Sequence, residues 1–147
     1  MKIAIDLRSL SSGSISGVEN YTLNLLDHLL ALDKKNSYTL FYNSFKSPMN
    51  RHATGAEDFH YINSEIKKTH YPNKLLNLAL KFKLTSLEKI IGPFDCLFMP
   101  NLNQFNINPA AKLAITVHDL SPIQTPEFYD IKRRIWHKFL DYKKSYQ

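Results

Sequence analysis

Three short polar stretches, each directly after an apolar run, hold the side chains of this sequence best suited to chemistry. They are Asp6-Leu7-Arg8, Pro100-Asn101 and His118-Asp119. An imidazole is neutral or charged near physiological pH, so His118 could hold a ligand hydroxyl or stabilise charge on a reacting oxygen. Asp119 could orient that imidazole or bind a hydroxyl itself. The alternative is structural: His118 ends a strand with its hydrogen bonds satisfied, and Asp119 forms the following turn.

A Gly/Ser-rich loop, residues 11–17, is a fourth candidate. It follows the first apolar run and precedes a helical pattern, so free N–H groups and the positive end of the helix dipole point into it. Such a loop suits a ligand that carries a phosphate or a sugar. It equally suits a plain strand-to-helix connection with Ser16 as the N-cap. Neither the dinucleotide fingerprint GxGxxG nor the P-loop fingerprint GxxxxGK[ST] is present.

The elements that must position these residues alternate between strand and helix. The predicted strands are the runs Ile3–Leu7, Tyr38–Tyr42, Phe59–Ile62, Phe94–Met99 and Leu113–Val117. The predicted helices are Val18–Leu32, with an apolar stripe on Val18, Tyr21, Leu25, Leu29 and Leu32, then Lys74–Ile91 and Phe128–Tyr142. This alternation predicts one α/β domain over residues 1–147, with a doubly wound, Rossmann-like parallel sheet. Ligands bind such sheets at the carboxyl ends of the strands, so the three polar stretches could converge on one site.

The stretch Lys74–Ile91 has an unusually wide apolar arc. Its two apolar rows are Leu76, Leu80, Leu84, Leu87 and Ile91, and Leu75, Ala79 and Phe82. One interpretation is a helix that covers both the sheet and a neighbouring helix. The other is an interfacial patch that contacts anionic lipid, because Lys81, Lys83 and Lys89 accompany the apolar arc.

Composition limits the class of protein. The chain has 147 residues, 44% of them hydrophobic, and a net charge of +6, which are the values of a globular protein with anionic partners. The lysines are scattered, which argues against nucleic acid. Cys96 stands alone and is expected to be a small buried hydrophobe, and the histidines lack the spacing of a zinc site. We expect a cytoplasmic protein, in contact at most with the inner face of a membrane.

Four segments in order carry a family resemblance: KIAIDLRSL, SGVENYTLNLL, FDCLFMPNLNQF and LAITVHDLSPIQTPEFY. Together they resemble the N-terminal domain of GT-B glycosyltransferases of family 4, particularly the bacterial mannosyltransferase-like enzymes of polysaccharide assembly. The resemblance implies two Rossmann-like domains across a cleft, of which the N-terminal one binds mostly the acceptor. It implies transfer of a hexose, such as mannose, with retention of configuration and without a metal or other cofactor. The nucleotide sugar is a co-substrate held mainly by the C-terminal domain.

Particular residues match the family's site. Gly17 matches a loop glycine near the donor phosphate, and His118 matches a cleft histidine near the transferred sugar. Cleft or acceptor contacts are expected at Asp119, Asn101, Glu127, Asp6 and Arg8. One departure concerns the loop: where the family often has Gly-Ile-Gly-Arg-Tyr, this chain has Gly-Val-Glu-Asn-Tyr, so Glu19 brings negative charge beside the phosphate position.

The other departure is length, because the family's donor domain has no counterpart in these 147 residues. We therefore expect the N-terminal part of a transferase, incomplete at its C-terminal end and inactive alone, acting on a glycan or lipid-linked acceptor with a donor domain supplied in trans. It would be a truncated product, an excised piece or half of a split enzyme. The alternatives are a non-catalytic domain that binds glycan or acceptor, and a module that acts at a membrane surface through Lys74–Ile91.

Overall fold

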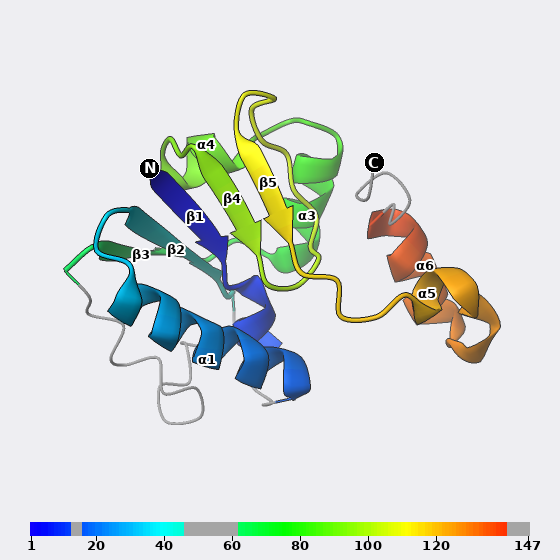
Figure 1. Cartoon of the computed structure of the whole chain (residues 1–147). Helices are drawn as coiled ribbons and strands as arrows, with labels where there is room; N and C mark the ends of the chain where they lie inside the picture. Colours follow the sequence, from blue (N-terminus) through cyan, green and yellow to red (C-terminus); the bar gives the residue numbers. More distant parts are fainter. Residues whose placement is uncertain (13–15, 46–61, 141–147) are drawn as a thin grey trace. The chain divides into compact units, whose positions relative to one another are not determined.

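A computed structural model describes residues 1–12, 16–45 and 62–140 (Figure 1). The chain divides into two compact units, Met1–Thr116 and Val117–Gln147. The first contains the sheet and the second contains short helices, and each is described by itself below.

The first unit contains a five-stranded sheet in which all described pairings are parallel. The strands are β1 (Lys2–Asp6), β2 (Ser37–Asn43), β3 (Ser64–Thr69), β4 (Cys96–Met99) and β5 (Lys112–Ile115). Their spatial order is β3-β2-β1-β4-β5. The helical segments of this unit are η1 (Arg8–Ser12), α1 (Gly17–Leu32), α3 (Asn73–Lys81) and α4 (Leu87–Ile91). The predicted α/β fold with a Rossmann-like parallel sheet is confirmed.

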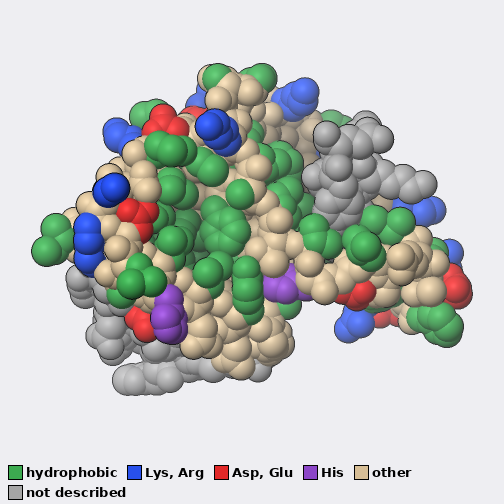
Figure 2. All heavy atoms as spheres, viewed as in Figure 1, with side chains coloured by type: hydrophobic (Ala, Val, Ile, Leu, Met, Phe, Trp, Pro, Cys, Tyr) green, Lys and Arg blue, Asp and Glu red, His purple; other side chains and the backbone are tan. Residues whose placement is uncertain are grey.

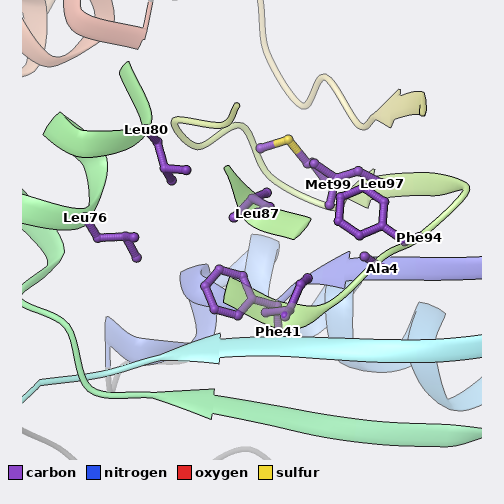
Figure 3. Packing of buried hydrophobic residues seen from close by; sticks show 9 residues of the cluster. Ala4, Phe41, Leu76, Leu80, Leu87, Phe94, Leu97 and Met99 are labelled. Carbon is purple, nitrogen blue, oxygen red and sulfur yellow. The ribbon is translucent and has the colours of Figure 1, made fainter. Parts of the chain in front are cut away.

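Helices cover the two faces of the sheet separately. On one face α1 packs through Leu26 and Leu30 against Ile5 and Leu40 of the central strands. On the other face α3 and α4 pack against a second cluster, whose labelled members in Figure 3 are Ala4, Phe41, Leu76, Leu80, Leu87, Phe94, Leu97 and Met99. The alternation of side chains along β1 explains this division, because Ala4 and Ile5 point to opposite faces.

The predicted apolar stripe of α1 is confirmed only in part, because Leu29 packs against the core as a half-buried residue. The helix buries Glu19, Thr22, Leu26 and Leu30, whereas Leu32 is exposed and Tyr21 is partly exposed. The segment LNLLDHLLAL carries leucines on more than one side of a helix, so its period alone does not select the buried side. Packing against β1 and β2 makes that choice.

The third strand is also placed differently from the prediction. The prediction of Phe59–Ile62 lies outside the described residues except for Ile62, which is in a turn rather than a strand. The strand found is β3, in a stretch partly expected to be a connection. It is an edge strand with the polar sequence SEIKKT, and Ile66 is its residue packed on the α1 side of the core. An edge strand with one solvated face has no apolar run to reveal it.

The predicted single helix over Lys74–Ile91 is wrong as well, because the structure has two helices, α3 and α4, with a turn between them. In that turn Lys83 has a φ of 56°, which ends the helical path. The apolar row continues across the break, since Leu76, Leu80, Leu87 and Ile91 are all buried in one cluster. Leu84 of the same predicted row is exposed in the turn, so the predicted periodicity matches the burial within each helix but not across the break.

The second unit contains α5 (Ser121–Gln124), η3 (Pro126–Phe128) and α6 (Ile131–Leu140). The helix predicted at Phe128–Tyr142 is confirmed over α6, although its isoleucines are exposed. No helix within residues 1–12, 16–45 and 62–140 is long and apolar enough to cross a membrane.

Candidate functional site

The strand order creates one preferred place for a ligand. β1 leads into α1 on one face of the sheet, whereas Phe105 and Ile107 of the segment after β4 pack on the other face, and β1 and β4 are neighbours. The loops that leave their carboxyl ends therefore diverge, which is the point where open α/β sheets bind ligands. Asp6 is the last residue of β1 and Arg8 comes just after it, and Asn101 follows β4. The candidate site is this strand-end region, residues 6–10 and 100–106.

Asp6 and Arg8 form a buried ion pair in the candidate site. Asp6 is 1% exposed and Arg8 is 8% exposed. Arg8 donates from Nη2 to Oδ2 of Asp6 at 2.6 Å and from Nε to Oδ1 at 2.9 Å, and its own backbone N–H donates to Oδ1 at 3.0 Å. Two nearly parallel hydrogen bonds satisfy the carboxylate and fix the plane of the guanidinium.

Arg8 also joins segments that are far apart in the sequence. Its Nη2 donates to the main-chain oxygen of Gln104 at 2.8 Å, and its Nη1 donates to Oδ1 of Asn77 on α3 at 3.3 Å. The guanidinium carbon lies 5.4 Å from the centre of the Phe41 ring. Arg8 therefore holds the loop after β4 against the end of β1, so we describe it as a positioning residue.

Two polar atoms in the same region have no hydrogen-bond partner among the described residues. They are the hydroxyl of Ser9 and Oε1 of Gln104, and both atoms are buried. A buried polar atom without a partner is costly, so such atoms usually bind water or a ligand. One hydroxyl and one acceptor near the ends of β1 and β4 therefore call for a water or ligand partner.

The start of α1 is organised by its own side chains. The backbone N–H of Ser16 donates to Oε2 of Glu19 at 2.9 Å, and the Ser16 hydroxyl also donates to that oxygen. This is the capping-box arrangement, and it sets a carboxylate at the positive end of the helix dipole. Glu19 is buried there. A phosphate at this helix end would therefore have to approach a carboxylate of like charge.

Gly17, the first residue of α1, has no structural need to be glycine. A Cβ added at this position would meet nothing within 4 Å, and its φ is not positive. The open space above its backbone is compatible with close approach of a ligand.

The loop after β4 is held along its length. Asn106 donates from Nδ2 to the main-chain oxygen of Thr85 at 2.6 Å, and the main-chain oxygen of Asn106 accepts from the N–H of Leu87 at 2.9 Å. Further on, the N–H of Asn108 donates to Glu88 at 2.7 Å. These contacts fix the loop that carries the half-buried Asn101, and they also stabilise the first turn of α4.

Asp119 lies in the second unit and forms a turn. Its Oδ1 accepts from the N–H of Ser121 at 2.6 Å, and its Oδ2 accepts from the hydroxyls of Ser121 and Tyr129, the latter at 3.2 Å. The hydrogen bonds from Ser121 lower the pKa of Asp119 below its usual value. This geometry supports the turn-forming interpretation of Asp119 and leaves a fixed, ionised carboxylate at the surface.

The predicted site residues thus fall into two groups. Asp6, Arg8 and Asn101 share one edge of the sheet, with Gly17 at the start of the helix that follows β1. The second group is His118, Asp119 and Glu127, which are exposed residues of the second unit. Convergence of the two groups stays a prediction.

Sequence reasoning missed three contributors to the candidate site: Ser9, Asn77 and Gln104. Ser9 adjoins the predicted Asp6–Arg8 stretch, so its position could have suggested it. Asn77 lies inside an apolar helical pattern and Gln104 in a polar loop, and nothing local marks either one. In the described ranges, no three His, Cys, Asp or Glu side chains gather in a group that could hold a metal ion.

Comparison with known proteins does not assign this chain to a family. No protein-family model, no curated protein and no solved structure matches the chain. Its function must be argued from the residues and their arrangement.

Proposed function

We propose that this chain forms the acceptor-side part of a retaining glycosyltransferase, which moves a hexose from a nucleotide sugar to a glycan or lipid-linked acceptor. The observation that carries the proposal is the separation of the segments that follow β1 and β4, together with buried polar atoms of Ser9 and Gln104 that have no hydrogen-bond partner among the described residues. Polar atoms of both kinds near the carboxyl ends of the strands suit a polyhydroxylated ligand. The motif resemblance supplies the reaction class.

Within this proposal the residues have different roles. Asp6 and Arg8 are positioning residues, because their charges neutralise each other and their hydrogen bonds are directed at protein atoms. Acceptor hydroxyls would meet the Ser9 hydroxyl, Gln104 Oε1 and the half-buried Asn101. His118 would act near the transferred sugar, where an imidazole can stabilise charge on a reacting oxygen. Asp119 and Glu127 would contribute at the acceptor side.

Within this proposal, binding of the nucleotide-sugar donor requires a second domain. Glu19 already accepts from the N-cap N–H of α1, and its negative charge opposes a diphosphate at that helix end. Transfer depends on holding donor and acceptor together while the leaving diphosphate is stabilised. We therefore propose that a C-terminal, nucleotide-sugar-binding domain supplies the cationic groups for the leaving group.

The test is complementation with such a donor domain, fused or in trans, with release of nucleoside diphosphate and the anomeric configuration of the product as readouts. The expected result for the unaltered chain is transfer with retention of configuration. The rate of transfer should fall by a factor of about 100 or more in His118→Ala, because the imidazole would stabilise the transition state. His28→Ala, an exposed histidine on α1, is the control. Transfer at full rate in His118→Ala removes that residue from the site. If calorimetry shows that the chain binds an acceptor but no nucleotide sugar supports transfer, the non-catalytic alternative would be favoured.

A second candidate function, contact with a membrane surface, is favoured by one observation on α3. The apolar residues of this region that are not buried form an exposed strip, comprising Leu75, Leu78, Phe82 and Leu84. Lys74 and Lys83 are exposed beside it. Vesicle pelleting at low and high salt tests this candidate. Binding that is equal for anionic and neutral lipid, or unchanged in Leu75→Asp with Phe82→Asp, would contradict it.

A further inference from the structure

Tyr71, two residues after the end of β3, is an exposed aromatic residue on a firmly held backbone. It is 51% exposed. One buried asparagine binds both of its main-chain groups: the N–H of Tyr71 donates to Oδ1 of Asn43 at 2.9 Å, and Nδ2 of Asn43 donates to the main-chain oxygen of Tyr71 at 3.0 Å. Asn43 is the last residue of β2 and is 0% exposed. The backbone that carries this ring is therefore fixed from the interior of the first unit.

The side-chain amide of Asn43 makes all four of its hydrogen bonds. Its Oδ1 also accepts from the hydroxyl of Thr69 at 2.7 Å, and its Nδ2 also donates to Oδ1 of Asn73 at 2.5 Å. A buried polar network in which every member is satisfied is rigid and has one arrangement. Thr69 ends β3 and Asn73 begins α3, so this network joins the ends of two strands to the start of a helix.

α3 connects the network to the candidate site. Asn73 and Asn77 are one turn apart and lie on the same side of the helix. Asn73 binds Asn43, and Oδ1 of Asn77 accepts from Nη1 of Arg8 at 3.3 Å. Because the paired strands of the sheet are parallel, Tyr71 lies at the same edge of the sheet as the candidate site. This edge is the one at which open α/β sheets bind ligands.

His70, next to Tyr71, adds a hydrogen-bonding group. Its Nδ1 lies 3.0 Å from the main-chain oxygen of Ser44, and a carbonyl oxygen can only accept, so Nδ1 carries the proton. Nε2 of the neutral ring is then an acceptor that suits a ligand hydroxyl. His70 is exposed, and so is a second aromatic residue, Phe45, just after the neighbouring strand β2. Adjacent residues thus offer an aromatic face and a polar acceptor.

The charges of this region favour an uncharged ligand. The segment 69–80 contains one residue of the Lys, Arg, Asp and Glu types, Lys74. Among the described residues on the face shown in Figure 2, lysine and arginine side chains stand in ones and twos. The face of an aromatic ring is partially negative. The C–H groups on one side of a pyranose ring are partially positive, so a sugar can pack on the aromatic ring and still use its hydroxyls for hydrogen bonds.

We propose that Tyr71 and His70 form a subsite for one pyranose unit of the acceptor. The sugar ring would pack on the tyrosine ring, and a sugar hydroxyl would donate to Nε2 of His70. This inference rests on the proposed function for the class of ligand. It adds an acceptor contact that is separate from Ser9, Asn101 and Gln104, at the ends of different strands.

The experiment titrates the full chain with α-linked mannotriose and without a donor domain, so it measures binding apart from transfer. Two-dimensional nitrogen–proton NMR follows the protein, and saturation transfer follows the sugar. The expected result is a shift of the main-chain N–H signals of His70 and Tyr71, with saturation transfer to the C–H protons of the sugar.

Variants separate the ring from general surface contact. Tyr71→Ala should weaken binding at least about fivefold, whereas Tyr71→Phe keeps the ring and should bind within about twofold of the unaltered chain. His70→Ala should weaken binding at least about threefold through the lost hydrogen bond. Phe82→Ala is the matched control, because it removes a similarly exposed aromatic residue just after α3, and it should bind within about twofold. Circular dichroism should show an unchanged fold in all four variants, since these side chains are exposed.

Equal binding by Tyr71→Ala and Phe82→Ala would overturn the subsite, and so would the absence of any mannotriose binding. Shifts at Ser9 and Gln104 with none at His70 and Tyr71 would also overturn it, but would leave the proposed function in place. Conversely, mannotriose binding at Tyr71 together with no transfer in the complementation experiment would support the subsite and count against the proposed transferase. Vesicle binding that is lost in Tyr71→Ala, with no effect on mannotriose, would assign the ring to the exposed strip on α3 instead.

Discussion

The guanidinium of Arg8 and the carboxylate of Asp6 are in contact at 2.6 Å with almost no exposure to water, at the carboxyl end of β1. Both residues are predicted ligand contacts, and the structure shows the protein interactions that they already make. A buried ion pair of this kind costs desolvation, and it persists because further hydrogen bonds satisfy both groups. The pair fixes the orientation of Arg8, and the hydrogen bond from Arg8 to the main-chain oxygen of Gln104 then holds the loop after β4.

Removing one partner of this pair should be strongly destabilising. Asp6→Asn leaves the Arg8 charge buried without its counter-ion, and we expect the free energy of unfolding to fall by about 3–5 kcal/mol. Urea denaturation followed by circular dichroism measures this change. Lys35→Met, which removes an exposed cation, should alter stability by less than about 0.5 kcal/mol. Equal effects of the two substitutions would show that the pair does not hold the loop.

Gly17→Ala and Gly92→Ala should have opposite effects on stability. Gly92, the C-cap of α4, has φ 92° and ψ 172°, a conformation open almost only to glycine, so alanine should cost on the order of 1–3 kcal/mol. At Gly17 the added methyl meets no atom, and alanine is the better helix former, so stability should stay level or rise by up to about 1 kcal/mol. Thermal unfolding of the two variants tests this contrast. A stable Gly17→Ala that loses transfer with a donor domain would show that a ligand, not the fold, requires the glycine.

Asp33 should make stability depend on pH in the acid range. Its carboxylate accepts from the Tyr38 hydroxyl at 2.5 Å, from the Asn36 side chain at 2.5 Å and from the N–H of Lys35 at 2.8 Å. These hydrogen bonds, with that of Tyr38 the strongest, lower the pKa of Asp33 below its ordinary value of 3.8. The stabilisation is therefore complete above about pH 5 and is lost as the pH falls through about 4 toward the lower folded-state pKa.

Urea unfolding between pH 6 and pH 3 measures this dependence. Asp33→Asn should be less stable than the unaltered chain at pH 6, and the difference should shrink on acidification. Tyr38→Phe keeps the buried ring and removes one donor, so the pKa of Asp33 should move part of the way back toward 3.8. A difference between Asp33→Asn and the unaltered chain that stays constant with pH would contradict the assignment.

Asn106→Ala should loosen the junction between α3 and α4. The substitution removes the hydrogen bond to Thr85, and we expect a loss of about 0.5–1.5 kcal/mol in the free energy of unfolding. Amide exchange should also accelerate at Leu87, whose N–H donates to the Asn106 main chain. Asn103→Ala in the same loop is the control. Exchange at Leu87 that is unchanged in Asn106→Ala would show that the side chain does not hold the turn.

The sequence by itself determined the alternation of strands and helices, the central strands β1 and β2, and the placement of Asp6, Arg8 and Asn101 at or just after the ends of strands. These features are local, because an apolar run or a helical period is read from neighbouring residues. The row of exposed isoleucines on α6 is visible in the sequence too, but only burial distinguishes it from a core-facing row. The same ambiguity explains why the predicted stripe of α1 matches its buried side only in part.

Only the tertiary structure decided which distant groups meet. The break between α3 and α4 depends on Asn106, which is about twenty residues further along the chain, and the fixed orientation of Arg8 depends on Gln104 and Asn77. The strand order that makes β1 and β4 neighbours is also non-local. Hydrogen bonds and packing across such separations leave no periodic signal in the chain, because they depend on the folded path rather than on neighbouring residues.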